Sequence, residues 1–202
     1  MAKKNNNAQD IVIRTIIKNK LFKKRNYLLL MVSGGSDSVA MCYLLNDYMP
    51  NNEHIAIMHL NHKIREDADA DEEFVKNLSK YLGYNFYSFS EDVKKIAELT
   101  SENMEAVGHE LRYEYANNAA EQWAKDINIK PENIVICSAH NADDRIENFY
   151  MRSIVGTGPG GFSSISYKNE NVARPLLDAP KEALQKYLLE KTNCYTDKNG
   201  NK

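Results

Sequence analysis

The stretch LLLMVSGGSDSVAMCYLL, residues 28–45, carries the clearest structural signal in this chain. It begins as an unbroken apolar run, typical of a buried parallel strand, and ends with apolar residues at helical spacing. The Gly-Gly turn between the two parts predicts a strand–loop–helix unit. The loop, residues 33–38, would then lie at the helix N-terminus, where unpaired backbone N–H groups and the helix dipole favour an anion.

The composition of this loop favours a phosphate group. Its two glycines let the backbone approach an anion closely, and its serines add hydroxyl donors. The loop lacks the GxxxxGK[ST] spacing of the common nucleotide-binding loop and contains no lysine. Its one acidic residue, Asp37, would either hold a divalent cation against the phosphates or cap the helix, and the residues alone leave both interpretations open. The candidate anion-binding residues are Ser33, Gly34, Gly35, Ser36, Asp37 and Ser38.

Length and composition are those of an ordinary globular protein. At 202 residues with a net charge of −2, the chain fits one domain with a full core. No run resembles a signal peptide or a membrane span, so we expect a cytoplasmic protein without membrane contact. Cys42, Cys137 and Cys194 form no metal-ligand spacing and are expected to be reduced. The basic residues 1–24 would suit either RNA contact or a solvated helix face, and we treat them as an arm packed on a domain of residues 25–202.

Four further segments have the composition of strands, and helical patterns separate them. These segments are residues 54–61, 85–89, 133–140 and 172–177. With the first strand they predict an α/β fold, an open parallel five-stranded sheet flanked by helices. Ligands bind outside the carboxyl ends of the strands in such sheets. We therefore expect His59 and Asn61 to face a nucleotide, although His59 would equally suit a satisfied strand histidine.

Two helices carry further candidate residues. A long helix that ends near Asp126, with Thr100 or Ser101 as its N-cap, carries Arg112, which would reach phosphates or form a surface ion pair. The last long strand ends at His140. The next helix presents Asp144 and Glu147, three residues apart and hence on one face. Two such carboxylates would hold an ammonium group or Mg²⁺. Alternatively, Asp143 and Asp144 would be simple first-turn acids.

Glycine and proline mark a loop and a helix start in the last part of the chain. The glycine-rich residues 156–162 predict a loop, either a connector or a cover over the site. Pro180 lies where a first-turn proline would open a helix over residues 181–189.

Taken together, these blocks resemble the tRNA(Ile)-lysidine synthetases of the ATP-pyrophosphatase (PP-loop) superfamily, from about Tyr27 to Asn199. SGGSDS at 33–38 carries the superfamily motif. The resemblance implies a Rossmann-like PP-loop fold. The blocks that carry the family resemblance are HLNH at 59–62 with Arg65, DADEEFV at 69–75, NME at 103–105, RY at 112–113, HNADD at 140–144 with Glu147, GTG at 156–158 and RPLL at 174–177.

The resemblance implies ATP-dependent ligation of free L-lysine to the wobble cytidine of tRNA(Ile) with a CAU anticodon. ATP would adenylate the cytidine and release pyrophosphate, and lysine would then displace AMP. Residues 33–38, His59 and Asn61 would bind ATP, and Asp37 would help to place Mg²⁺. Asp144 and Glu147 would recognise lysine, while Arg112 and His140 would line the reaction centre. A homodimer is one expectation for the assembly.

The sequence departs from the family pattern in three places. His109 stands where the family usually has an arginine, and the loop near Gly160 lacks its usual basic residue. The family continues into C-terminal tRNA-gripping domains, so we expect the chain to be either a minimal enzyme or an excised catalytic domain. Two alternatives stay open: a PP-loop tRNA thiolase, disfavoured because its cysteine pairs are missing, and an ATP-binding domain without independent turnover.

Overall fold

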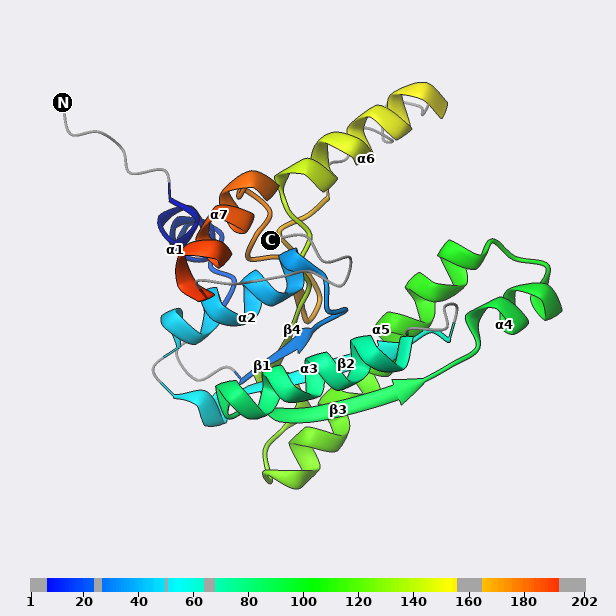
Figure 1. Cartoon of the computed structure of the whole chain (residues 1–202), viewed down its shortest axis with the longest axis horizontal. Helices are drawn as coiled ribbons and strands as arrows, with labels where there is room; N and C mark the ends of the chain where they lie inside the picture. The colour runs from blue at the N-terminus through cyan, green and yellow to red at the C-terminus, as the bar shows by residue number, and fades with distance from the viewer. Residues whose placement is uncertain (1–6, 24–26, 50, 64–67, 156–164, 193–202) are drawn as a thin grey trace.

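Six strands form one sheet in the order β3-β2-β1-β4-β6-β5 (Figure 1). The computed structural model describes residues 7–23, 27–49, 51–63, 68–155 and 165–192. All neighbouring strands are parallel except β5, which pairs antiparallel with β6. The strands are β1 (Tyr27–Met31), β2 (Ile55–Asn61), β3 (Asn85–Ser90), β4 (Ile134–Cys137), β5 (Lys168–Asn169) and β6 (Val172–Ala173).

Helices connect the strands and cover both faces of the sheet. The α-helices are α1 (Ala8–Lys18), α2 (Ser36–Tyr48), α3 (Ala68–Leu82), α4 (Val93–Thr100), α5 (Met104–Asp126), α6 (Ala142–Val155) and α7 (Lys181–Thr192). Two short 3₁₀ helices, η1 (Asn52–His54) and η2 (Pro131–Asn133), precede β2 and β4. Within the described residues, none of the helices combines the length and apolarity that a bilayer span requires.

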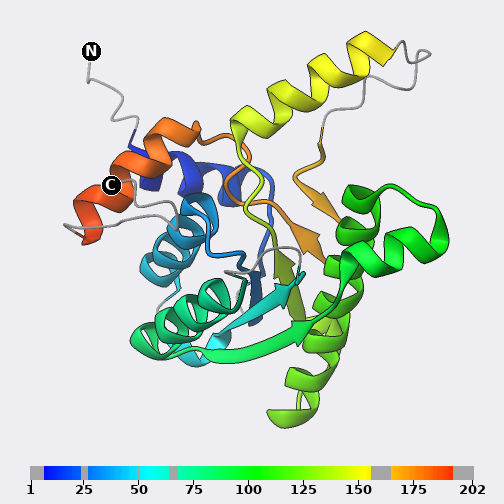
Figure 2. The same ribbon diagram turned by 45° about the vertical axis from the view of Figure 1, so that its right-hand side comes forward.

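The sheet separates two apolar cores. Figure 2 shows α5 on one side of the sheet and α2 and α3 on the other. On one face α1, α2, α3 and α7 pack against alternate residues of the strands. On the other face α5 packs with a row of alanines and one tryptophan, Trp123. Because successive strand side chains point to opposite faces, the apolar runs of β1, β2 and β4 supply both cores. Burial of apolar surface holds these layers together, because each Å² removed from water contributes about 25 cal/mol of stabilisation.

The α/β class and the parallel sheet are as predicted, but the sheet has one strand more than the five expected. The additional strand is β5, two exposed residues that turn into β6 through Glu170, whose φ of 48° is positive. A polar strand of this length has no periodicity to detect, which is why the sequence did not reveal it. The long helix also begins later than predicted: its N-cap is Asn103, whose side chain accepts hydrogen bonds from the backbone N–H groups of Glu105 and Ala106.

The strand order reverses direction between β1 and β4. Connections from β1 lead outward to β2 and β3, whereas β4 lies on the other side of β1. The loops that follow β1 and β4 therefore separate and leave a crevice at the carboxyl ends of these strands, the place where open α/β sheets bind ligands. Helix α6 starts at this crevice and extends away from the other helices (Figures 1 and 2).

Candidate functional site

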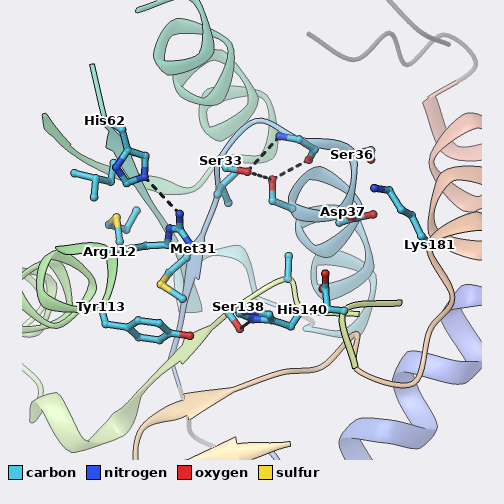
Figure 3. A pocket seen from close by; sticks show the side chains of 17 residues that line it. Met31, Ser33, Ser36, Asp37, His62, Arg112, Tyr113, Ser138, His140 and Lys181 are labelled. Atoms are coloured by element: carbon cyan, nitrogen blue, oxygen red, sulfur yellow. Dashed lines mark hydrogen bonds between the residues drawn. The ribbon is translucent and has the colours of Figure 1, made fainter. Parts of the chain in front are cut away.

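A cavity of about 470 Å³ lies at this crevice, within the range of small-molecule sites. Its walls come from the loop after β1, the ends of β2 and β4, the middle of α5 and the start of α7 (Figure 3). Apolar side chains of Met31, Met58 and Leu60 form part of the lining, and polar groups converge from several elements. Asp37, Arg112, His140 and Asp144, which sequence analysis assigned to separate blocks, therefore share one site.

The loop after β1 is shaped for an anion. Gly34 has φ of +89°, a conformation that side-chain-bearing residues rarely adopt, so the turn depends on glycine here. Gly35 is the N-cap of α2 and gives the helix no side-chain cap. The Ser38 hydroxyl donates to the Gly35 carbonyl at 2.8 Å, which holds the first turn closed. The first backbone N–H groups of α2 thus lack a capping acceptor and border the cavity, as an anion site requires.

Asp37 lies in this first turn and is held from the opposite loop. Its Oδ2 accepts a hydrogen bond of 3.2 Å from the side-chain amide of Asn141, which follows β4. Its Oδ1 is buried and has no hydrogen-bond partner within the described residues. Burial raises the pKa of the Asp37 carboxyl, and nearby Asp144 and Asp143 act in the same direction, while the Lys181 ammonium opposes them. The carboxylate is therefore poorly compensated by the protein itself.

This carboxylate suits Mg²⁺ only in combination with a phosphate. The described residues contain no cluster of three or more metal-ligating side chains. Mg²⁺ commonly binds to one or two carboxylates together with substrate phosphates, and the unpartnered Oδ1 of Asp37 provides one such oxygen beside the anion loop. The donor set thus fits an ion delivered with a nucleotide.

The start of α6 is organised by a reciprocal cap. Asn141 Oδ1 accepts hydrogen bonds from the backbone N–H groups of Asp143 and Asp144, and Asp144 Oδ2 accepts from the Asn141 N–H at 2.8 Å. These hydrogen bonds satisfy backbone N–H groups in the first turn of α6 and fix Asp144 at the cavity wall. Glu147 lies one turn further along α6, exposed and outside the lining. The shared face predicted for the two carboxylates is present, with Glu147 beyond the rim.

Arg112 and His62 face each other on another wall of the cavity (Figure 3). Arg112 Nη2 lies 3.5 Å from His62 Nε2. Burial, followed by the charge of Arg112, lowers the pKa of His62 to about 4, so its imidazole is neutral at pH 7 and accepts from the guanidinium. No carboxylate of the described residues pairs with Arg112, which leaves its charge available to the cavity.

His140 and Tyr113 complete the lower wall in Figure 3. The His140 Nδ1 lies 2.8 Å from the Ser138 hydroxyl, and Tyr113 accepts a hydrogen bond from Arg174 at 3.4 Å. Burial, then the charge of Arg174, lowers the pKa of His140. A neutral imidazole can exchange hydrogen bonds with a substrate without adding charge to this already basic wall.

His59 and Asn61 lie elsewhere than expected. Both side chains are almost fully buried, and neither lines the cavity. His59 Nδ1 donates to the Val32 carbonyl at 2.8 Å, and Asn61 donates to Asp69 and Glu72 on α3. The reason is the strand period of two, which turns Met58, Leu60 and then His62 toward the cavity instead. Through these hydrogen bonds, His59 holds the start of the loop after β1 and Asn61 holds the start of α3, both outside the cavity.

Lys181 is a cavity residue that sequence analysis did not single out. It is the first residue of α7 and reaches the cavity beside Asp37 (Figure 3). Its only sequence signal was its position directly after Pro180 at a helix start, which indicates structure and not a ligand. Tertiary packing of α7 against α2 brings it to the loop after β1.

Some predicted features fall outside the described residues. These are Arg65, the glycine-rich residues 156–162, Cys194, and residues 1–6 and 24 of the basic arm. Of the cysteines that the structure describes, Cys42 and Cys137 are free and fully buried, as expected for small core residues.

In sequence, the chain is similar to several tRNA(Ile)-lysidine synthases. The family model described as a PP-loop domain matches residues 5–202. A tRNA(Ile)-lysidine synthase from Clostridium acetobutylicum is 35% identical over 95% of this chain, and one from Clostridium tetani is 33% identical over 90%. The chain spans only 42% and 38% of the length of these two relatives.

Solved structures show the same fold at low sequence identity. The U34-tRNA thiolase NcsA from Methanococcus maripaludis, solved with its [4Fe-4S] cluster, superposes with a TM-score of 0.66 at 17% identity, covering 92% of this chain and 63% of that one. An NH₃-dependent NAD synthetase from Campylobacter jejuni gives a TM-score of 0.54 at 16% identity, covering 92% and 73%. At such identities these similarities support the architecture and not a shared substrate.

Proposed function

This chain belongs to the PP-loop domain family, and on that premise we propose that it is the ATP-using catalytic part of a tRNA-modifying ligase. The proposed reaction joins free L-lysine to the wobble cytidine of a tRNA(Ile) with a CAU anticodon. The observation that carries the proposal is the meeting of the anion loop, Asp37, Arg112, His140 and Asp144 around one cavity at the strand switch point.

The first step would be adenylation of the cytidine. The cytidine O2 attacks the α-phosphorus of ATP, the bond to the β-phosphate oxygen breaks, and pyrophosphate leaves. This step needs no enzyme nucleophile, so catalysis rests on positioning and on charge stabilisation. The uncapped start of α2 and the Arg112 guanidinium supply the donors for the phosphate oxygens. Mg²⁺ bound at Asp37 would neutralise further phosphate charge.

The second step would be attack by lysine. The ε-amine, once deprotonated, bonds to C2 of the cytidine and displaces AMP. Asp144, at the cavity wall, and Glu147, one helical turn beyond it, would attract the ammonium group of lysine. A carboxylate can select the cation and then accept its proton.

The thiolase alternative is less consistent with the site. Sulfur delivery requires an accessible cysteine thiolate. Cys42 and Cys137 are fully buried, neither lines the cavity, and burial raises the pKa of both thiols.

The test is incorporation of radiolabelled lysine into an unmodified CAU-anticodon tRNA(Ile) transcript by the purified 202-residue chain. We expect label in the tRNA only when ATP is present, with release of one pyrophosphate for each lysine. Pyrophosphate release that depends on tRNA but never leads to labelled tRNA would contradict the ligase assignment. ATP binding with no turnover at all would instead favour the ATP-binding domain that lacks independent activity.

A variant of α6 tests the lysine assignment within this reaction. We expect Glu147→Gln to raise the KM for lysine about tenfold or more, because a charge-assisted hydrogen bond is worth roughly 1.5–3 kcal/mol. Pyrophosphate release with tRNA and ATP alone should stay within about twofold. Glu132→Gln, an exposed acid on η2, is the matched control. Equal increases in the KM values for lysine and ATP would remove Glu147 from lysine recognition.

A further inference from the structure

A cluster of polar side chains around Asp178 joins four separate parts of the chain at the start of α6. Asp178 lies in the turn between β6 and α7. Its Oδ1 accepts hydrogen bonds from Arg145 on α6 at 3.1 Å and from the Tyr167 hydroxyl at 2.7 Å. Its Oδ2 accepts a hydrogen bond from Thr15 on α1 at 3.0 Å. These four residues lie outside the cavity lining, so their contacts with one another do not depend on a ligand.

Arg145 is the member of this cluster that belongs to α6. Its guanidinium also donates to the Tyr167 hydroxyl at 3.0 Å and lies over the Tyr167 ring, 5.3 Å from the ring centroid. The side chains of Arg145 and Asp178 are 32% and 34% exposed, so water screens their charges only in part. Several partners at fixed angles hold the planar guanidinium in one orientation, which a single exposed ion pair does not do.

Helix α6 takes its direction from the contacts at its start. It extends away from the other helices (Figures 1 and 2), and the large apolar side chains of residues 146–154 are each more than half exposed. The Ala142 N–H donates to the Ala179 carbonyl at 3.1 Å. The first N–H of α7 donates to Asp143 Oδ2 at 2.8 Å. These two bonds fix the end of α6, and Arg145 adds an attachment one turn further along, which resists tilting of the helix axis.

We propose that Arg145 is a positioning residue that sets the direction of α6 and thereby places Asp144 and Glu147 for lysine. This inference rests on the proposed function, since it concerns the lysine step at the same site. Arg145 and Glu147 are two residues apart, so their side chains leave the helix about 200° from each other, on nearly opposite sides. The cluster therefore holds one side of α6 and leaves the side with the two carboxylates to the substrate. Because Glu147 lies further from the attached end than Asp144, a tilt of α6 displaces Glu147 more.

Steady-state kinetics of lysine incorporation test this role. We expect Arg145→Met to raise the KM for lysine about tenfold or more, while the KM for ATP and tRNA-dependent pyrophosphate release change by less than about twofold. Removal of a positive charge near two carboxylates would by itself favour binding of the lysine cation, so a rise in KM reports displacement of the helix. Arg145→Lys should recover part of the loss. Thr15→Val removes a hydrogen bond to the same Asp178 carboxylate but leaves α6 attached, and this matched control should keep the KM for lysine.

A distance measurement tests the direction of α6 without any turnover. Nitroxide labels would be attached to Met151→Cys on α6 and Glu121→Cys on α5, both exposed positions, in a Cys194→Ser background. Cys42 and Cys137 are fully buried and would not be labelled. Double electron–electron resonance should give one narrow distance distribution for the labelled chain and for its Thr15→Val variant. Arg145→Met should broaden or shift this distribution.

The outcomes distinguish this role from the proposed function. An unaltered distance distribution in Arg145→Met would overturn the role of Arg145 in directing α6. A changed distribution with an unaltered KM for lysine would overturn the connection between the direction of α6 and lysine. Equal rises in the KM values for lysine and ATP would also overturn it, because they would indicate a general disturbance of the site. Failure of the unaltered chain to incorporate lysine would overturn the proposed function, whereas the distance distributions would still test the attachment of α6.

Discussion

At the scale of single residues, Asp37 lowers the stability of the fold in a position where it would help to bind the nucleotide. One of its carboxylate oxygens accepts from Asn141, and the other is buried without a partner in the described part of the chain. A buried, incompletely bonded carboxylate destabilises a folded protein when it is ionised. The proposed Mg²⁺ and phosphates would compensate this charge only when the nucleotide is bound.

We therefore expect Asp37→Asn to make the chain more stable and less active. The pKa of Asp37 is raised in the folded state, so ionisation costs stability above that pKa, and the cost disappears as the pH falls below the ordinary value of 3.8. The variant should melt a few degrees higher near pH 7.5, since ~1 kcal/mol shifts Tm by roughly 2–4 °C in a chain of this size. The difference should shrink toward pH 4. Pyrophosphate release should fall about 100-fold or more.

Thermal melts at several pH values, with Glu121→Gln on α5 as a surface control, check this expectation. A lower Tm for Asp37→Asn near pH 7.5 would show that the carboxylate is well compensated, against the interpretation given above.

At the scale of elements, the first turn of α6 joins helix capping to the site. Asn141 is buried, caps the helix with its Oδ1 and holds Asp37 with its Nδ2. Asn103 caps α5 in the same way, but its side chain bonds only to the backbone of α5 and not to a cavity residue. Comparison of the two asparagines therefore separates the role of Asn141 as a helix cap from its role in holding Asp37.

We expect Asn141→Ala and Asn103→Ala each to cost about 1 kcal/mol of unfolding free energy, the usual value of a lost cap. Only Asn141→Ala should also reduce ATP-dependent pyrophosphate release, by about tenfold or more, because it frees the Asp37 carboxylate. Urea unfolding and steady-state kinetics on the same samples measure both effects. Similar losses of activity in the two variants would attribute the effect to stability alone.

At the scale of the whole molecule, the sheet depends on a single helix for one of its faces. Four alanines of α5 (Ala116, Ala119, Ala120 and Ala124) allow this helix to pack closely on the sheet. Trp123 fills the remaining space: it is fully buried and meets the Tyr27 ring edge-on at 5.6 Å between centroids. Its indole N–H has no partner in the described residues.

We expect Trp123→Ala to destabilise the chain by about 3–5 kcal/mol through the cavity that it leaves. Trp123→Phe should cost much less, about 1.5 kcal/mol or below, because it keeps an aromatic ring and removes the unpartnered N–H. Urea unfolding monitored by far-UV circular dichroism compares the two variants. Equal destabilisation would contradict this expectation, because it would mean that a phenyl ring does not restore the packing of the indole.

The sequence by itself determined the features that depend on near neighbours in the chain. The apolar run before Ser33 and the helical spacing after Ser38 made β1, the anion loop and α2 predictable, because strand and helix periods are local. The acids of α6 were placed on one helix face for the same reason. The α/β class followed from the alternation of such segments.

Tertiary structure alone decided which residues from distant parts of the chain lie together at the site. The two-residue strand β5 exists only through its pairing with β6, and the orientation of β2 turned His59 and Asn61 away from the cavity. Lys181 reaches Asp37 because α7 packs on α2, across about 140 residues of sequence. Local patterns carry no record of such distant contacts, since these are fixed by which apolar faces pack together and by the direction in which each strand presents its side chains.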